Sequence, residues 1–166
     1  MSWRVYSDPL QHALIAAAVS APLVSSAGPG VLATATVAAV AIDVDHAVAA
    51  RSLKVDALTS LDTRPRTHSL LAATTAGAIT GVVAGPAHGW AVFSGLVSHL
   101  LHDAGDQAAP TPMLWPVRPA RQLGRRWQLA ATAALLAGSV VVSRATASAS
   151  SRAGNGDAGT SPPRTG

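Results

Sequence analysis

The sequence lacks several kinds of residue, and each absence excludes a class of chemistry. It contains no cysteine, which excludes disulfide bonds, thiolate metal sites and cysteine nucleophiles. It contains no glutamate either, so any catalytic or metal-binding carboxylate must come from one of its aspartates. Aromatic residues make up 4% of the 166 positions and charged residues 12%, whereas soluble domains usually carry about 25% charged residues. A soluble enzyme therefore fits this composition poorly.

Long apolar runs take the place of the missing charge. Hydrophobic residues, mostly Ala, Val and Leu, make up 49% of the chain. Glycine, proline and charged residues divide them into five stretches: 9–27, 31–48, 69–84, 90–103 and 127–142. Their lengths lie at or below the roughly 20 residues that a helix needs to cross a bilayer. We therefore expect an all-α, integral membrane bundle of four to five short apolar helices.

Helix boundaries follow from the residues that flank these stretches. Asp8 is expected to cap the first helix, with Pro9 at its first position, and Thr67 is expected to cap the third. Beyond residue 143 the chain is rich in Ser, Ala, Gly, Thr and Pro without periodicity. We therefore expect a helical membrane domain at 1–143 and a disordered tail at 144–166.

Basic residues predict how the helices are oriented in the membrane. The two long linkers carry most of them, whereas the two short turns carry none: Arg51, Lys54, Arg64 and Arg66 in the first linker, and Arg118, Arg121, Arg125 and Arg126 in the second. The positive-inside rule places both linkers and the N-terminus on the cytoplasmic side of a multi-pass protein. A nucleic-acid partner is not expected, because aromatic residues do not alternate with the basic ones. The expected partner is the lipid bilayer.

The N-terminal segment also has features of a secretory signal. Arg4 precedes the apolar run ALIAAAVSAPLV, and the small residues at 25–27 resemble a cleavage site. Asp8 and His12 interrupt this pattern. A retained first helix is therefore the preferred interpretation.

The segment GLVSHLLHDAGD, residues 95–106, ends an apolar helix with a polar cluster. His99, His102, Asp103 and Asp106 are spaced i, i+3, i+4 and i+7, so they share one helical face. Imidazole and carboxylate groups suit zinc, manganese or iron. The alternative is a helix end that is polar only because it meets water.

Alternating short and long connections predict that other polar residues join this cluster. An up-and-down bundle brings His12, the motif DVDH at 43–46, His68 and the 95–106 segment to one end, beside the basic linkers. Ionisable groups near a bilayer are costly unless paired, hydrated or metal-bound, so their convergence predicts a functional site. His88 falls at the other end and is expected to be structural or solvated. Helix capping is the alternative explanation for DVDH and His68.

The DVDH motif places its two aspartates differently. Asp43 and His46 are three residues apart and share a helical face. Asp45 points elsewhere unless the helix is unwound at this point.

Four motifs together resemble a known family. DVDH at 43–46, RTHSLL at 66–71, SHLLHD at 98–103 and MLWP at 113–116 resemble the YdjM-like family of membrane-bound proteins, described as metal-dependent hydrolases. The resemblance covers roughly residues 12–127. It implies a multi-helix inner-membrane protein that binds a divalent metal through matching positions: His12, Asp43, Asp45, His46, His68, His99 and Asp103. The sequence departs from the family pattern at Thr63, where a histidine is common, and in the glycine missing after SHLLHD.

On this resemblance we assign roles to the matching residues. We expect a divalent ion, Zn, Mn or Fe, to be bound by the following residues: His12, His68, His99 and Asp103, with Asp45 and His46 completing the site or binding a second ion. Asp43 and Asp106 are the expected catalytic residues, which accept a proton from water or orient the ligating imidazoles. Arg64 and Arg66 could neutralise a substrate anion, or could serve only as topology signals.

The expected function is a membrane-bound metal-dependent hydrolase that acts on a small-molecule or lipid-like substrate, such as a phosphate ester. One alternative is a metal-ion or proton transporter, whose site would lie near the bilayer midplane. Another is a non-catalytic membrane protein whose polar cluster only holds the helices together. The sequence leaves the oligomeric state open.

Overall fold

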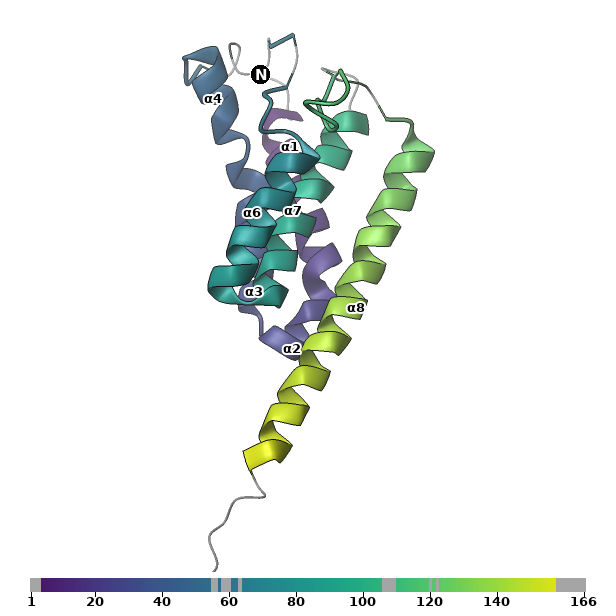
Figure 1. Ribbon diagram of the computed structural model, residues 1–166. Helices are drawn as coiled ribbons and strands as arrows, with labels where there is room; N and C mark the ends of the chain where they lie inside the picture. The colour runs from purple at the N-terminus through teal and green to yellow at the C-terminus, as the bar shows by residue number, and fades with distance from the viewer. Residues whose placement is uncertain are drawn as a thin grey trace, which may run out of the picture.

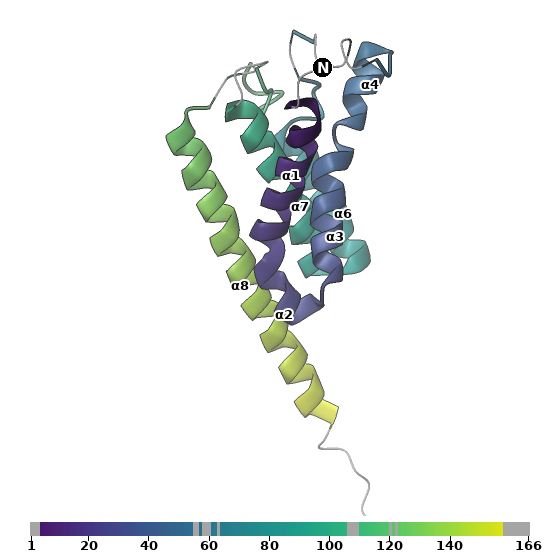
Figure 2. The ribbon, with the colours of Figure 1, turned by 180° about the vertical axis from the view of Figure 1, so that it is seen from behind.

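The helices run up and down past one another, and the long last helix lies along one side (Figures 1 and 2). This computed structural model describes residues 4–54, 57, 61–62, 64–105, 110–119, 121 and 123–157. Its helices are α1 (Arg4–Ser20), the 3₁₀ turn η1 (Ala21–Leu23), α2 (Val24–Ala27), α3 (Gly30–Ala41), α4 (Val44–Ala50), α6 (Leu70–Ala84), α7 (Pro86–Gly105) and α8 (Arg125–Asp157). The expected all-α membrane bundle is confirmed.

Three helical segments are long and apolar enough to cross a membrane. They are Pro9–Ala27, Gly30–Ala50 and Arg125–Arg152, and the shorter apolar helix Leu70–Ala84 lies among them. Several exposed side chains on these segments are large and apolar, including Leu14, Val37 and Ile79. Lipid contact accounts for such exposure, because apolar side chains are stable in a bilayer without protein partners.

Two predicted helix starts were wrong. α1 begins at Arg4, so Pro9 lies inside the helix rather than at its first position, and the side chain of Asp8 lies outside the described residues. Ser69, not Thr67, caps α6. Ser69 has an extended backbone, and its hydroxyl accepts a hydrogen bond from the amide of Ala72 at 3.3 Å.

The predicted second helix is interrupted within the DVDH motif. A turn at residues 42–43 separates α3 from α4. Shorter-range hydrogen bonds replace the helical pattern here, from Asp45 N to Ile42 O and from His46 N to Asp43 O, both at 3.1 Å. This is the unwinding that a shared site with Asp45 would require.

The last helix extends past its predicted end at residue 142. α8 continues to Asp157, so the first part of the expected disordered tail is helical. Alanine favours helix, and the hydroxyls of Thr146, Ser150 and Ser151 donate hydrogen bonds to carbonyls four residues earlier. The division of the chain at residue 143 stays a prediction, and residues 158–166 lie outside the described ones.

α7 is the central helix and packs against α1, α3, α6 and α8. Glycines permit the closest approaches. A Cβ atom on Gly89 would lie 2.5 Å from the Cα of Gly81 on α6, and one on Gly95 would lie 2.4 Å from the carbonyl oxygen of Ala35 on α3. Trp90 joins α7 to α8 by donating a 2.8 Å hydrogen bond to Ser139. α7 is thus held firmly in place, and it carries His99 and Asp103.

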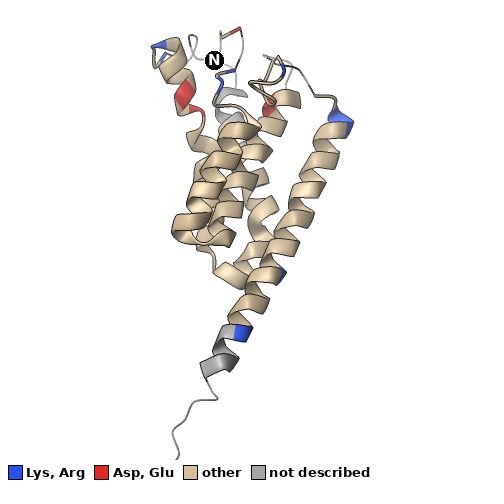
Figure 3. Cartoon of the chain, viewed as in Figure 1, with Lys and Arg blue, Asp and Glu red and all other residues tan. Residues whose placement is uncertain are grey.

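Charged residues gather mainly at one end of the bundle (Figure 3). The acidic side chains of α4 and α7 and the basic linkers after α4 and α7 lie at this end, together with the start of α1. Arg144 and Arg152 on α8 are exceptions towards the other end. The predicted convergence of the polar motifs is therefore seen in the structure.

Candidate metal centre

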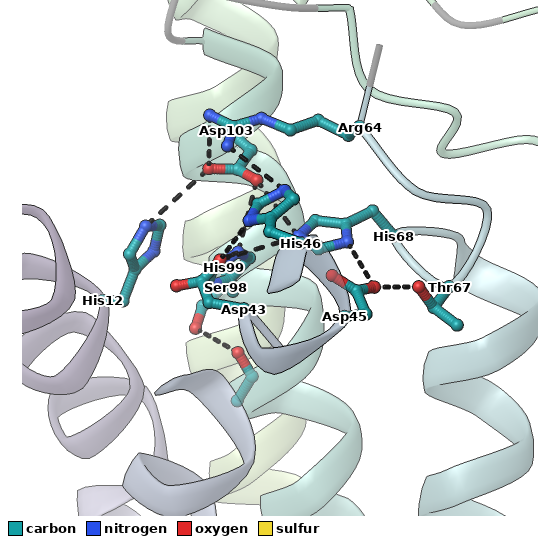
Figure 4. A network of polar contacts seen from close by, with 11 residues as sticks. His12, Asp43, Asp45, His46, Arg64, Thr67, His68, Ser98, His99 and Asp103 are labelled. Carbon is teal, nitrogen blue, oxygen red and sulfur yellow. Dashed lines mark hydrogen bonds and ion pairs between the residues drawn. The ribbon is translucent and has the colours of Figure 1, made fainter. Parts of the chain in front are cut away.

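Residues from separate segments meet at the charged end of the bundle (Figure 4). α1 provides His12, the turn after α3 provides Asp43, and α4 provides Asp45 and His46. The segment before α6 provides His68, and α7 provides His99 and Asp103. The break between α3 and α4 is what turns the DVDH motif towards α7.

Four of these residues form a closed set of alternating nitrogen and oxygen atoms, here called the quartet: His68, Asp43, His99 and Asp103. Asp43 Oδ1 lies 3.8 Å from His68 Nε2 and 3.4 Å from His99 Nε2. Asp103 Oδ2 lies 3.5 Å from His68 Nε2 and 3.2 Å from His99 Nε2. Each carboxylate therefore faces both imidazoles.

The four nitrogen–oxygen distances of the quartet are near those of a metal coordination shell, and the ligand atoms of three members, His68, His99 and Asp103, lie within 4.8 Å of one another. Ligand atoms at about 2.0 to 2.1 Å from a tetrahedral ion lie about 3.3 Å from one another, which is close to the four observed distances. Within the described part of the chain, Nε2 of His68, Nε2 of His99 and Oδ2 of Asp103 are buried and form no hydrogen bond. Buried polar atoms without hydrogen bonds are costly, and a cation at their common centre would satisfy them. The residues present therefore fit a divalent metal.

His12 and His46 extend the quartet on two sides. The His12 imidazole stacks on that of His99, with ring centroids 3.8 Å apart, and its Nε2 lies 3.7 Å from Asp103 Oδ1. His46 Nδ1 lies 3.4 Å from Asp43 Oδ1. The ligand atoms of His12, Asp43 and His99 lie within 4.8 Å of one another, as do those of Asp43, His46 and His68. The cluster therefore offers more ligand atoms than one tetrahedral ion uses.

Asp45 contacts His68 at the ring nitrogen that does not face the quartet. Its Oδ2 is 3.1 Å from Nδ1 of His68, and it also accepts a hydrogen bond from the hydroxyl of Thr67. A carboxylate on one imidazole nitrogen keeps the proton there and leaves the other nitrogen free to bind a metal. Asp43 thus lies in the quartet, and Asp45 contacts the other nitrogen of a quartet member. The roles expected for the two aspartates stay predictions.

Arg64 supplies positive charge at the edge of the cluster. Its Nη2 lies 3.3 Å from Asp103 Oδ1, and its Nη1 lies 3.5 Å from His46 Nε2. The sequence suggested Arg64 only as a substrate-binding or topology residue. Its position two residues before the RTHS motif at 66–69 was the available signal for a role inside the site.

The carboxylates also change the protonation of His68. Burial by itself lowers the pKa of this imidazole, but the neighbouring carboxylates of Asp43 and Asp45 outweigh burial and raise the pKa to about 9. Without a metal, His68 is therefore protonated at neutral pH. A metal ion that binds its Nε2 must displace that proton.

The remaining sequence candidates lie outside the quartet. His102 is half-buried, and its imidazole meets that of His12 edge-on at 4.6 Å. Asp106, an expected catalytic residue, lies outside the described residues. His88 lies at the other end, where its Nδ1 is 3.0 Å from the hydroxyl of Thr34, in agreement with the structural role expected for it.

Comparisons with known proteins give one family. The family model described as YdjM inner membrane protein matches residues 8–155. Neither the curated proteins nor the solved structures gave a match. The matched range covers every quartet residue and most of the helical bundle. The chain therefore belongs to the YdjM inner membrane protein family.

Proposed function

We propose that this protein is a metal-dependent hydrolase of the inner membrane that cleaves a lipid-like or phosphate ester at the cytoplasmic face. The quartet is the observation that carries this proposal, because its nitrogen and oxygen atoms are spaced for a cation and three of them are buried without hydrogen bonds. His68, His99, Asp43 and Asp103 would hold the ion, and its imidazole and carboxylate ligands suit Zn, Mn or Fe. When bound, such an ion supplies Lewis acidity, which lowers the pKa of a water from about 15.7 towards 7.

The protein's own side chains would do the remaining work. Asp45 holds His68 in one tautomer, with Thr67 fixing Asp45 in turn. Asp43 is the most exposed quartet member, at 33% of its side chain, so water can reach it. Its Oδ1 would bind the ion, and its Oδ2, which is not one of the quartet atoms, would accept a proton from water. Asp106 stays a second candidate for this role. Arg64 can contact an anionic group of a substrate beside the quartet, because its guanidinium already lies next to Asp103.

The candidate spans give an approximate depth for the cluster. His12 is three residues from the start of its candidate span, and Asp43 is seven residues from the end of its own. With a helical rise of about 1.5 Å per residue, these positions lie about 5 and 10 Å from the ends of the spans. The midplane of a bilayer core lies about 15 Å from either side, so His12 lies nearer to the boundary, where an ester substrate meets water, and Asp43 lies deeper, nearer to the midplane.

Hydrolysis by purified protein tests the proposal. The wild type, reconstituted in vesicles, is treated with a chelator, reloaded with Zn, Mn or Fe, and assayed with p-nitrophenyl phosphate and p-nitrophenyl butyrate. We expect activity that chelation removes and one of the metals restores, that Asp103→Asn abolishes, and that the control His88→Gln retains. Activity that survives chelation would overturn the proposal. Metal uptake into the vesicles without any hydrolysis would also overturn it, in favour of transport.

A further inference from the structure

A small apolar pocket lies in the linker between α7 and α8. Its volume is about 200 Å³. Most of its wall is apolar. The lining residues include Thr111, Met113, Leu114, Arg118, Arg121 and Leu123. An isolated antiparallel bridge between Thr111 and Arg121 closes the linker on itself and gives the pocket a fixed shape.

Hydrogen bonds join the pocket wall to the metal centre. The amide of Leu123 donates to the carbonyl of Ala104, directly after Asp103. The amide of Arg64 donates to the carbonyl of Pro110 at 3.2 Å, directly before Thr111. A ligand in the pocket would therefore lie beside the two segments that carry Asp103 and Arg64.

The lining suits a molecule with an apolar chain and an anionic group. Met113, Leu114 and Leu123 provide the apolar surface. Arg118 and Arg121 are exposed at its edge, and none of the described lining residues is acidic. Arginine binds phosphate oxygens through paired N–H groups. Charge and hydrophobicity thus both select an anionic amphiphile.

Thr111 forms a buried part of the pocket wall. Its side chain is 1% exposed and lines the pocket, and its Oγ1 forms no hydrogen bond within the described part of the chain. A buried hydroxyl without a partner is costly.

The size and position of the pocket favour a membrane lipid over a free metabolite. Pockets that enclose a whole small molecule usually measure about 300 to 1,000 Å³, so this one would hold only part of a ligand. The same linker exposes Leu114, Trp115 and Val117 at 48%, 37% and 84%. Apolar and aromatic side chains of this kind lie readily at a membrane surface, from which a lipid chain could enter the pocket.

We infer that this pocket binds an acyl chain of an anionic membrane lipid and that Arg118 and Arg121 hold its phosphate. The inference rests on the proposed hydrolase function and deepens it, because it names the substrate class as an anionic lipid ester. Arg64, beside Asp103, would contact the same head group from the metal side.

Binding of short-chain lipids tests the inference directly. Dihexanoyl phosphatidic acid is the probe. Dihexanoyl phosphatidylcholine, which has no net charge, is the control for the anionic group, and glycerol 3-phosphate, which has no acyl chains, is the control for the apolar part. Calorimetry on the detergent-purified protein should show the probe binding at least about tenfold more tightly than either control, since losing charge-assisted contacts or apolar burial costs at least this much. Met113→Trp, which fills the pocket, should remove the preference over glycerol 3-phosphate.

Matched arginine variants separate the pocket from general electrostatic attraction. The double variant Arg118→Gln, Arg121→Gln should lose the preference for the probe over phosphatidylcholine. The control Arg125→Gln, Arg126→Gln removes the same charge at the start of α8, away from the pocket lining, and should keep that preference. Equal binding of the three compounds by the wild type would overturn the inference, as would an equal loss in both double variants.

Metal content, measured on the same samples, distinguishes failure of the lipid-binding proposal from failure of the hydrolase proposal. The pocket variants should retain the metal content of the wild type. A wild type that shows the lipid preference but holds no metal would contradict the proposed hydrolase and support the pocket. A wild type that holds metal without any lipid preference would contradict the pocket alone.

Discussion

The two ring nitrogens of His68 have different surroundings. Nδ1 contacts Asp45 at 3.1 Å, whereas Nε2 faces the carboxylates of Asp43 and Asp103 without a hydrogen bond. In the proposed metal site, one aspartate would orient the imidazole, and the other two would provide ligand oxygens on its other side. This division of labour leads to two predictions at the residue scale.

Asp45→Asn should weaken metal binding without removing it. Loss of a carboxylate that orients a ligating histidine typically lowers metal affinity by about 10- to 100-fold. Asp103→Asn should have a larger effect, because it replaces a ligand oxygen of the quartet. Competition with a fluorescent zinc chelator measures both affinities, and an Asp45→Asn affinity equal to that of the wild type would show that Asp45 does not orient His68.

Metal affinity should rise with pH up to about 9. The carboxylates around His68 raise its pKa to about 9, so below this pH a metal must displace a proton from its imidazole. One displaced proton gives about a tenfold gain in apparent affinity per pH unit, and this gain ends when the pH passes the pKa. In Asp45→Asn the pKa of His68 should fall, so the plateau should begin at a lower pH. Affinity that stays constant between pH 6 and 9 would contradict the assignment of His68 as a ligand.

Sequence reasoning identified the residues of the site better than their roles. Periodicity places His99 and Asp103 on one face of α7, and this needs only the helical repeat. The position of Asp43 in the quartet and of Asp45 outside it depends on the turn at residues 42–43, which nothing in the local sequence marks with glycine or proline. The pairing of Thr67 with Asp45 could not be predicted for the same reason, because it joins residues from separate segments.

Glycine contacts hold the helices that carry the quartet. Gly89 on α7 lies against Gly81 on α6, and Gly95 on α7 lies against Ala35 on α3. α6 follows His68 directly, and α3 ends just before Asp43. The spacing of the helices therefore sets the spacing of the quartet.

Gly89→Ala should destabilise the bundle. The added methyl group would lie 2.5 Å from the Cα of Gly81 and 2.7 Å from the carbonyl oxygen of Gly77, so α6 and α7 must move apart. Overpacking of this kind usually lowers the free energy of unfolding by about 1 to 3 kcal/mol. Thermal unfolding in detergent measures the change. Gly124→Ala, which places its methyl group in open space, is the control and should leave the unfolding temperature nearly unchanged.

Helix existence was easier to predict than helix ends. The five apolar stretches all contain helix, because long runs of Ala, Val and Leu between breakers leave few alternatives. The predicted end of α8 was wrong. Serine residues suggest a disordered tail, but among alanines their hydroxyls can also donate hydrogen bonds to helix carbonyls four residues earlier. The Ser69 cap was also missed, because Thr67 offers the same side-chain chemistry two residues earlier.

For the whole molecule, the shared location of the linkers and the metal centre makes the membrane orientation testable. The chain has no native cysteine, so single-cysteine variants report one position each. Two positions are suitable for cysteine. Leu53 lies at the charged end and is 87% exposed, and Ala84 lies at the opposite turn. If the charged end is cytoplasmic, a membrane-impermeant maleimide should label Ala84→Cys in intact spheroplasts and Leu53→Cys only in inverted vesicles. The reverse pattern would contradict the cytoplasmic placement.

The lengths of the connections between helices predict the arrangement of the whole molecule. Short turns at 28–29 and 85 and long linkers after α4 and α7 alternate, so the polar helix ends had to gather on one side. The linker pocket could not be predicted in this way, since its wall depends on hydrogen bonds such as that from Leu70 N to Met113 O. Contacts between residues far apart in the sequence produce no periodic pattern from which they could be predicted.

Elemental analysis of the purified protein tests the metal centre most directly. The wild type and the control His88→Ala should each contain about one divalent ion or more per chain, whereas His99→Ala, Asp103→Ala should contain less than about a tenth of that amount, because it removes half of the quartet. Equal metal content in the double variant and the wild type, or a wild type without bound metal, would contradict the assignment of these histidines and aspartates as ligands.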